Sequence, residues 1–73
     1  MTTFNVNMIK GNHISRTKEA TITINGTTVT VHQFGNENTA DVWVTTSTTA
    51  KRIVKNIDVN EAIEYANQIL MTL

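Results

Sequence analysis

His32 and Asp41 have the side-chain types of a catalytic pair, in which a carboxylate orients a histidine that removes a proton. Such a base also needs a nucleophile and groups that stabilise an oxyanion. The chain has no cysteine, and its glycines stand alone in turn-like segments rather than in a strained elbow or a phosphate-binding loop. We therefore expect a protein that is not an enzyme.

No metal or cofactor is expected either. The absence of cysteine removes thiolate ligands as well as disulfides. His13 and His32 are too few for a histidine-based metal cage, and their spacing from Glu37 or Asp41 is no better than chance.

The aromatic residues near this pair are better suited to binding. Trp43 is the single tryptophan of the chain, and Phe34 is one of two phenylalanines. Aromatic side chains are favoured anchors at protein interfaces, and they also stack on the bases of single-stranded nucleic acid. Which of these uses is open to them depends on the face of the sheet that they occupy.

The segment TITINGTTVTV, residues 21–31, predicts a β-hairpin. Asn25-Gly26 suits a type I′ turn, which needs positive φ at both central positions, and β-branched residues alternate on either side. The register that follows pairs Ile24 with Thr27, Ile22 with Val29, and Ala20 with Val31. A shift of one residue would destroy the agreement between register and polarity.

A second reversal extends this pattern to a third strand. A four-residue loop over 35–38 sets Val31 opposite Val42, His32 opposite Asp41, and Thr30 opposite Trp43. One face is then apolar, with Ile22, Ile24, Val29, Val31, Val42 and Val44. The other face carries Thr21, Thr23, Thr28, Thr30, His32, Phe34, Thr39, Asp41, Trp43 and Thr45.

The rest of the chain is less regular until its last segment. Alternation of Phe4, Val6 and Met8 predicts a first strand, whereas 10–18 has no period and is expected to be a loop. Residues 46–50 form a polar connection. The spacing over 51–57 fits either a helix or a short edge strand, and we favour the strand.

The last segment predicts an α-helix of about 14 residues. Asp58 fits an N-cap with Glu61 three residues later, and Ile57 before the cap can pack on Ala62. An apolar stripe follows at helical spacing: Val59, Ala62, Ile63, Ala66, Ile69, Leu70 and Leu73. Residues 1–73 should therefore form a single small α+β domain, an antiparallel meander of about four strands, or five, with the C-terminal helix packed on the apolar face.

Charge and hydropathy indicate a cytoplasmic protein. Six basic and six acidic residues cancel, so no overall field favours nucleic acid or anionic lipid. No apolar run approaches the roughly 20 residues of a membrane span. The N-terminal residues lack the basic segment and continuous apolar core of a signal peptide.

These features predict a small protein-binding module: a regulator, adaptor or inhibitor. Small proteins of this kind are common among phage and mobile-element products, although no residue of this chain points to such a source. The predicted binding residues are Trp43, Phe34, His32 and Asp41, or an edge strand that pairs with a partner. A purely structural role is the other interpretation, with His32 and Asp41 as an ion pair and Trp43 over threonine methyl groups. A homodimer that covers the Trp43 face is left open, because so short a chain without disulfides has a small core.

The alternative function is binding of single-stranded nucleic acid. Trp43 and Phe34 would stack on bases, while basic side chains would contact phosphates. The basic residues fall into two groups: Lys10, Arg16 and Lys18, then Lys51, Arg52 and Lys55. The sequence does not show whether the two groups adjoin each other or the Trp43 face, and solvated surface charges are the simpler interpretation.

Overall fold

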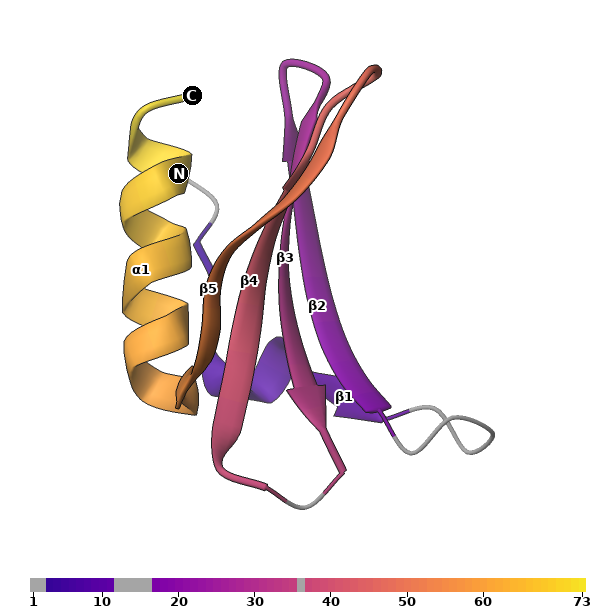
Figure 1. The fold of residues 1–73 in the computed structure, drawn as a ribbon. Coiled ribbons are helices and arrows are strands. Elements are labelled where there is room, and N and C mark those ends of the chain that lie inside the picture. The colour runs from indigo at the N-terminus through magenta and orange to yellow at the C-terminus, as the bar shows by residue number, and fades with distance from the viewer. Residues whose placement is uncertain (1–2, 12–16, 36) are drawn as a thin grey trace.

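The computed structural model describes residues 3–11, 17–35 and 37–73. Within these ranges one antiparallel sheet packs against a single α-helix, α1 (Val59–Met71) (Figure 1). The strands lie side by side in chain order: β1 (Lys10–Gly11), β2 (Thr17–Ile24), β3 (Thr27–Phe34), β4 (Thr39–Thr45) and β5 (Ala50–Asp58). The predicted α+β meander with a C-terminal helix on one face is confirmed.

The hairpin between β2 and β3 has the predicted turn and register. Asn25 and Gly26 have φ of 51° and 80°, the left-handed region that a type I′ turn requires at both positions. Ile22 pairs with Val29 and Ala20 with Val31, as the alternation predicts. The same pairing continues to Thr17 and Phe34, so β2 starts within the segment that was expected to be a loop.

The apolar face of the sheet forms the core beneath α1. Val29, Val31 and Val42 are completely buried, and the helix residues Ala62 and Ala66 are buried with them. The two alanines leave room for the helix to approach the branched side chains of the strands closely. The predicted apolar stripe and the predicted apolar sheet face therefore meet, and most of the buried hydrophobic surface lies between them. The exception is Leu73, which follows the end of the helix and is exposed.

The helix begins where its capping signal places it. The Asp58 side chain accepts a hydrogen bond from the backbone N–H of Asn60 at 3.0 Å, which satisfies one of the free donors of the first turn. Glu61 lies in that first turn, where a negative charge favours the positive end of the helix dipole. In the described parts of the chain, no helix has the length and apolar content needed to cross a membrane.

Residues 51–57 form a strand, as favoured, but β5 is irregular. Ala40 pairs with Ile57, Val42 with Val54, and Trp43 with Arg52, so the register shifts twice. Asn56 has a φ of 53°, a left-handed conformation that asparagine tolerates better than most residues. These two bulges explain why no single period, of two or of 3.6 residues, is visible over this segment.

The predicted first strand over Phe4–Met8 is wrong. Val6–Met8 form a 3-10 helix, and the Asn5 side chain caps it by accepting a hydrogen bond from the N–H of Asn7 at 3.0 Å. Asparagine offers the backbone this local alternative to a strand, and the alternation of apolar residues does not reveal it.

Phe4 instead joins the core through the helix. Its ring is buried, and its backbone N–H and C=O both bond to the Asn67 side chain, at 2.6 and 3.1 Å. One amide side chain thus satisfies both polar groups of a residue that would otherwise pair within a sheet. The first strand of the sheet is β1, two residues that pair with Lys18 and Glu19 of β2.

Candidate protein-binding face

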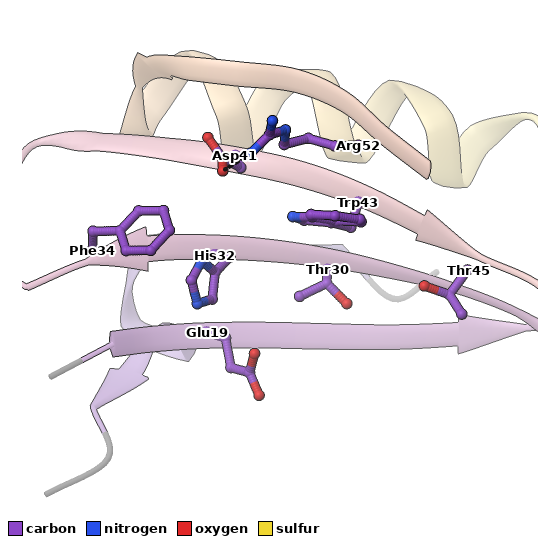
Figure 2. Close-up of a pocket in the computed structure, with 8 residues that line it drawn as sticks. All are labelled: Glu19, Thr30, His32, Phe34, Asp41, Trp43, Thr45 and Arg52. Carbon is purple, nitrogen blue, oxygen red and sulfur yellow. Dashed lines mark ion pairs between the residues drawn. The ribbon is translucent and has the colours of Figure 1, made fainter. Parts of the chain in front are cut away.

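We call the face of the sheet that points away from α1 the open face. It contains a shallow groove (Figure 2). The groove has a volume of about 390 Å³. It is lined by Glu19, Thr30, His32, Phe34, Asp41, Trp43, Thr45 and Arg52. All four residues predicted to bind protein, Trp43, Phe34, His32 and Asp41, therefore lie together in one depression.

Trp43 lies in the middle of the open face. It pairs with Thr30 of β3 on one side and with Arg52 of β5 on the other. The Arg52 guanidinium lies 5.7 Å from the centre of the indole ring, within the range of a cation–π contact. The indole is half-buried by these neighbours, and its remaining surface faces the groove.

Phe34 and His32 form a second aromatic group at one end of the groove. Their ring centroids are 4.5 Å apart and the ring planes are almost perpendicular, at 88°. This edge-to-face arrangement is favourable between aromatic rings. Phe34 keeps 43% of its surface exposed, because no element covers it in the described structure. An exposed ring held in place by a neighbour is a suitable anchor for a partner.

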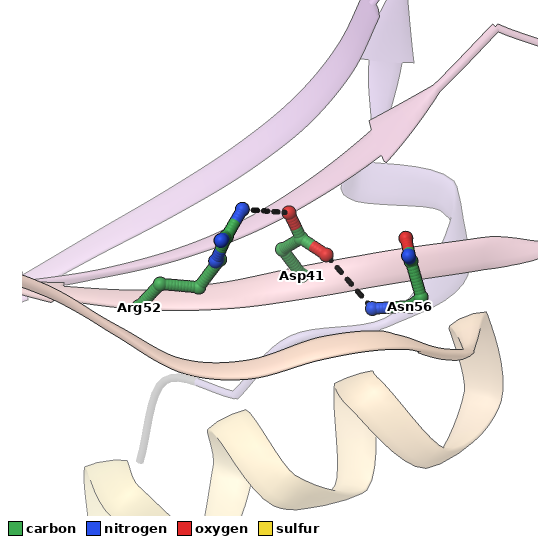
Figure 3. Close-up of polar contacts among 3 residues, drawn as sticks. All are labelled: Asp41, Arg52 and Asn56. Atoms are coloured by element: carbon green, nitrogen blue, oxygen red, sulfur yellow. Dashed lines mark hydrogen bonds and ion pairs between the residues drawn. The ribbon is translucent and has the colours of Figure 1, made fainter.

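Asp41 makes different contacts from those expected (Figure 3). It lies directly opposite His32, as predicted, but its carboxylate oxygens point to β5. One oxygen accepts a hydrogen bond from the backbone N–H of Asn56 at 2.9 Å, and the other lies 3.5 Å from Arg52. The predicted ion pair between His32 and Asp41 is therefore replaced by an ion pair with Arg52.

These contacts give Asp41 a structural role on the open face. Its side chain is only 2% exposed, so its charge needs partners. The Asn56 N–H belongs to the bulged part of β5, and the carboxylate holds that bulge in place. Arg52 supplies the opposite charge while 40% of its own side chain stays accessible.

The exposed charges of the open face lie on its two flanks, and its third charged residue, Asp41, is buried beside Arg52. Glu19 is on β2, opposite His32, and Arg52 is on β5, opposite Trp43. The two strands are separated by β3 and β4, which carry the aromatic side chains between them. The groove therefore has an acidic flank, an aromatic centre and a basic flank.

The predicted basic groups do not join into one patch. Lys18 lies on β2 and Lys51, Arg52 and Lys55 lie on β5, so about 14 Å separates the two strands at normal strand spacing. Lys10 is in β1, next to β2, and Arg16 lies outside the described residues. Arg52 alone among the described basic side chains lines the open face, and it already contacts Asp41.

The described residues of the open face were also candidates for metal binding and for acid–base chemistry. Over residues 3–11, 17–35 and 37–73, no group of three or more metal-ligating side chains gathers. His13 lies outside these ranges. Because Asp41 bonds to Asn56 and Arg52, it does not orient His32 as a general base.

The sequence analysis did not place Glu19 or Arg52 on the open face, and it named Arg52 only as part of a basic group. Extension of the hairpin register by one residue pair beyond Ala20 and Val31 places Glu19 opposite His32. That signal was present in the alternation. The position of Arg52 depends on the two bulges of β5, and no simple period reveals those.

A second hollow, of about 270 Å³, lies on the other side of the sheet between α1 and β5. It is lined by Val44, Thr49, Lys51, Ile53, Tyr65 and Ile69. Ile53 and Tyr65 remain about 40% exposed there. The bulge next to Ile53 directs this side chain to the helix side, which strict alternation along β5 does not predict.

Comparisons with known proteins do not extend this picture, because no family model, no curated protein and no solved structure matches the chain.

Proposed function

We propose that this protein is a small, non-enzymatic protein-binding module that recognises its partner through the open face. The observation that supports this most directly is the position of the aromatic side chains. Trp43, His32 and Phe34 line one groove on a sheet face that α1 does not cover. Aromatic side chains with an apolar body and restricted rotamers are frequent anchors at protein interfaces.

The surrounding residues support the same proposal. Threonines such as Thr30 and Thr45 form the floor beside the indole and present methyl groups that a partner can cover. Glu19 and Arg52 lie at the rim, where charged residues determine orientation and specificity. A regulator, adaptor or inhibitor would use such a surface without chemistry of its own.

The distribution of charge weighs against the nucleic-acid alternative. A binder of single strands needs a basic groove along its aromatic residues. Here the acidic Glu19 and Asp41 line the same groove as the aromatic rings. Lys18 has the parity of the helix side of β2, Lys51 lines the hollow on the helix side, and no described lysine lines the groove.

Capture of partners from extracts of the producing cells tests the proposal. The wild-type protein is immobilised beside Thr30→Arg, which places a bulky charge on the groove floor, and Trp43→Ala, which removes the anchor. Glu64→Arg is the control, because Glu64 is exposed on α1. The proposal expects partners that the wild type and the control retain and that both groove variants lose.

Two outcomes would contradict it. Equal retention by all four proteins would show that the groove does not bind the partner. Tight, salt-sensitive binding of a labelled single-stranded oligonucleotide, with loss in Trp43→Ala, would favour the nucleic-acid alternative instead. Circular dichroism of each variant confirms that the fold is retained.

A further inference from the structure

We infer that the partner of the open face is a second copy of this chain, in a face-to-face dimer with twofold symmetry. This inference rests on the proposed function of the open face and names its occupant. It is argued from the charges on the two flanks of the groove, the size of the molecule and the construction of β5.

The charge layout of the open face is complementary to itself. A twofold axis parallel to the strands, between β3 and β4, exchanges β3 with β4 and β2 with β5. Glu19 on β2 then lies opposite β5 of the second copy, at the level of Asp41. Arg52 pairs with Trp43, two residues further along, but its guanidinium reaches back to 3.5 Å from Asp41 and so comes near Glu19 of the second copy. The same pair forms again on the other side. Isologous interfaces form each contact twice in this way.

The central strands match under the same operation. His32, which lies opposite Asp41 within one chain, faces Asp41 of the second copy. Thr30, which pairs with Trp43, faces the indole of the second copy. Each tryptophan is therefore covered by a small β-branched residue and not by another large ring. Two twisted sheets pack in this manner with their strands about 30° apart.

Arg52 can form the intermolecular pair without losing its present contact. One guanidinium nitrogen lies near Asp41, and the group has five N–H donors in total. The partly exposed side of the guanidinium is thus free to bind Glu19 of the second copy. A carboxylate at that place would complete the coordination of a cation that is half-covered by an indole.

The size of the molecule limits the size of such an interface. The Cα atoms of sheet and helix together span 31 × 22 × 20 Å. Stable complexes bury about 800 Å² per partner, so a dimer through one face of so small a molecule would be a small and weak one. Because 73 residues without a cysteine provide a small core, cover for the second sheet face also adds stability.

Pairing along the edge of the sheet is a poorer way to bring two copies together. Antiparallel addition of β5 to β5 would use the free edge of this strand. The two bulges interrupt the row of backbone groups that such pairing needs.

The experiment is sedimentation velocity of the full chain from about 10 µM to about 1 mM, a range that includes the micromolar dissociation constants of small interfaces. The wild type is expected to become dimeric over this range. Glu19→Arg and Arg52→Glu each set like charges against each other twice, and both should remain monomeric. Their equimolar mixture restores both opposite-charge pairs, so a dimer is expected again in the mixture.

Two further variants keep the test independent of Arg52, whose replacement also removes the partner of Asp41. Thr30→Arg blocks the groove floor and should be monomeric, whereas Glu64→Arg, the same change as in Glu19→Arg but on the exposed helix surface, should dimerise normally. Circular dichroism establishes that each variant is folded. If Arg52→Glu does not fold, the comparison of Glu19→Arg and Thr30→Arg with Glu64→Arg decides.

A wild type that stays monomeric at about 1 mM would overturn the dimer, as would dimers that survive both Glu19→Arg and Thr30→Arg. Monomeric wild type that still captures a different protein, with loss in Thr30→Arg, would overturn the dimer and leave the protein-binding role of the open face standing. Absence of both dimer and capture would overturn both proposals.

Discussion

The two faces of the sheet are built from alternate residues of the same strands, yet they differ in burial and in polarity. On the face beneath α1, Val29, Val31 and Val42 are completely buried. On the open face, the residues between them, Thr30 and His32, are only half-buried and line a groove. A strand places successive side chains on opposite sides, so one segment contributes to both faces.

This difference separates the face that stabilises the fold from the face that we propose binds a partner. Burial of branched aliphatic side chains against a helix supplies most of the free energy of folding. The open face contributes less to folding, and its residues can therefore be selected for contact with a partner. Its exceptions are Asp41 and Arg52, which also hold β5 in place.

The largest predicted difference between the two faces comes from placing an aspartate on each side of β3 in turn. Val31→Asp buries an unpaired charge in the core and should cost at least about 4 kcal/mol, which unfolds a chain of this size. Thr30→Asp, one residue away, should retain the fold and lose about 1 kcal/mol or less. Urea unfolding followed by circular dichroism measures both, and equal losses would contradict the assignment of the faces.

The next largest effect is expected from the hydrogen bonds that hold Phe4 against α1. Asn67→Ala removes both hydrogen bonds to Phe4 and should lower the free energy of unfolding by about 2–3 kcal/mol. Gln68→Ala, on the exposed side of the same helix, is the matched control and should change it by no more than about 0.5 kcal/mol. Similar unfolding curves for the two variants would contradict a stabilising role for the Asn67–Phe4 hydrogen bonds.

A smaller effect is expected where the open face supports β5. Asp41→Ala leaves the Asn56 N–H without its acceptor and should cost about 1–3 kcal/mol. Asp41→Asn keeps an acceptor oxygen and loses only the charge interaction with a partly exposed Arg52, so about 1 kcal/mol or less is expected. Amide hydrogen exchange should increase over β5 in the alanine variant and stay slow in β2, and uniform exchange would argue against a local role.

The smallest effect concerns the left-handed residue of the bulge. Asn56→Gly should be close to neutral, whereas Asn56→Ala should lose about 1 kcal/mol, because alanine has a steric cost at a φ of 53°. Thermal unfolding of the two variants distinguishes them. A more stable alanine variant would indicate that the residue is not left-handed in solution.

Most of the sheet could be predicted because two independent turns assign each strand residue to the same face. Asn25-Gly26 sets the register of β2 on β3, the register predicted for β4 on β3 is also the one observed, and both leave Val31 on the helix side. Trp43 and His32 then fall on the open face without further assumptions. The helix followed from its Asp58 cap and its apolar stripe.

The remainder depended on contacts between segments far apart in the chain. The burial of Phe4 relies on Asn67, and neither residue reveals this in its local pattern. The partner of Asp41 is Arg52 and not His32, because the bulges of β5 bring the guanidinium and the Asn56 N–H towards the carboxylate. Alternation predicts the face on which each residue lies, but it does not predict which group forms an ion pair or hydrogen bond with a charged side chain.

The account depends on contact through the open face, and site-specific photo-crosslinking in the producing cells tests this most directly. A photoreactive phenylalanine analogue replaces Thr30 on the groove floor in one protein and Glu64 on the exposed helix surface in another. We predict adducts with a protein, either a second copy of the chain or another partner, from position 30 and none from position 64. Adducts from position 64 in the absence of any from position 30 would contradict the account.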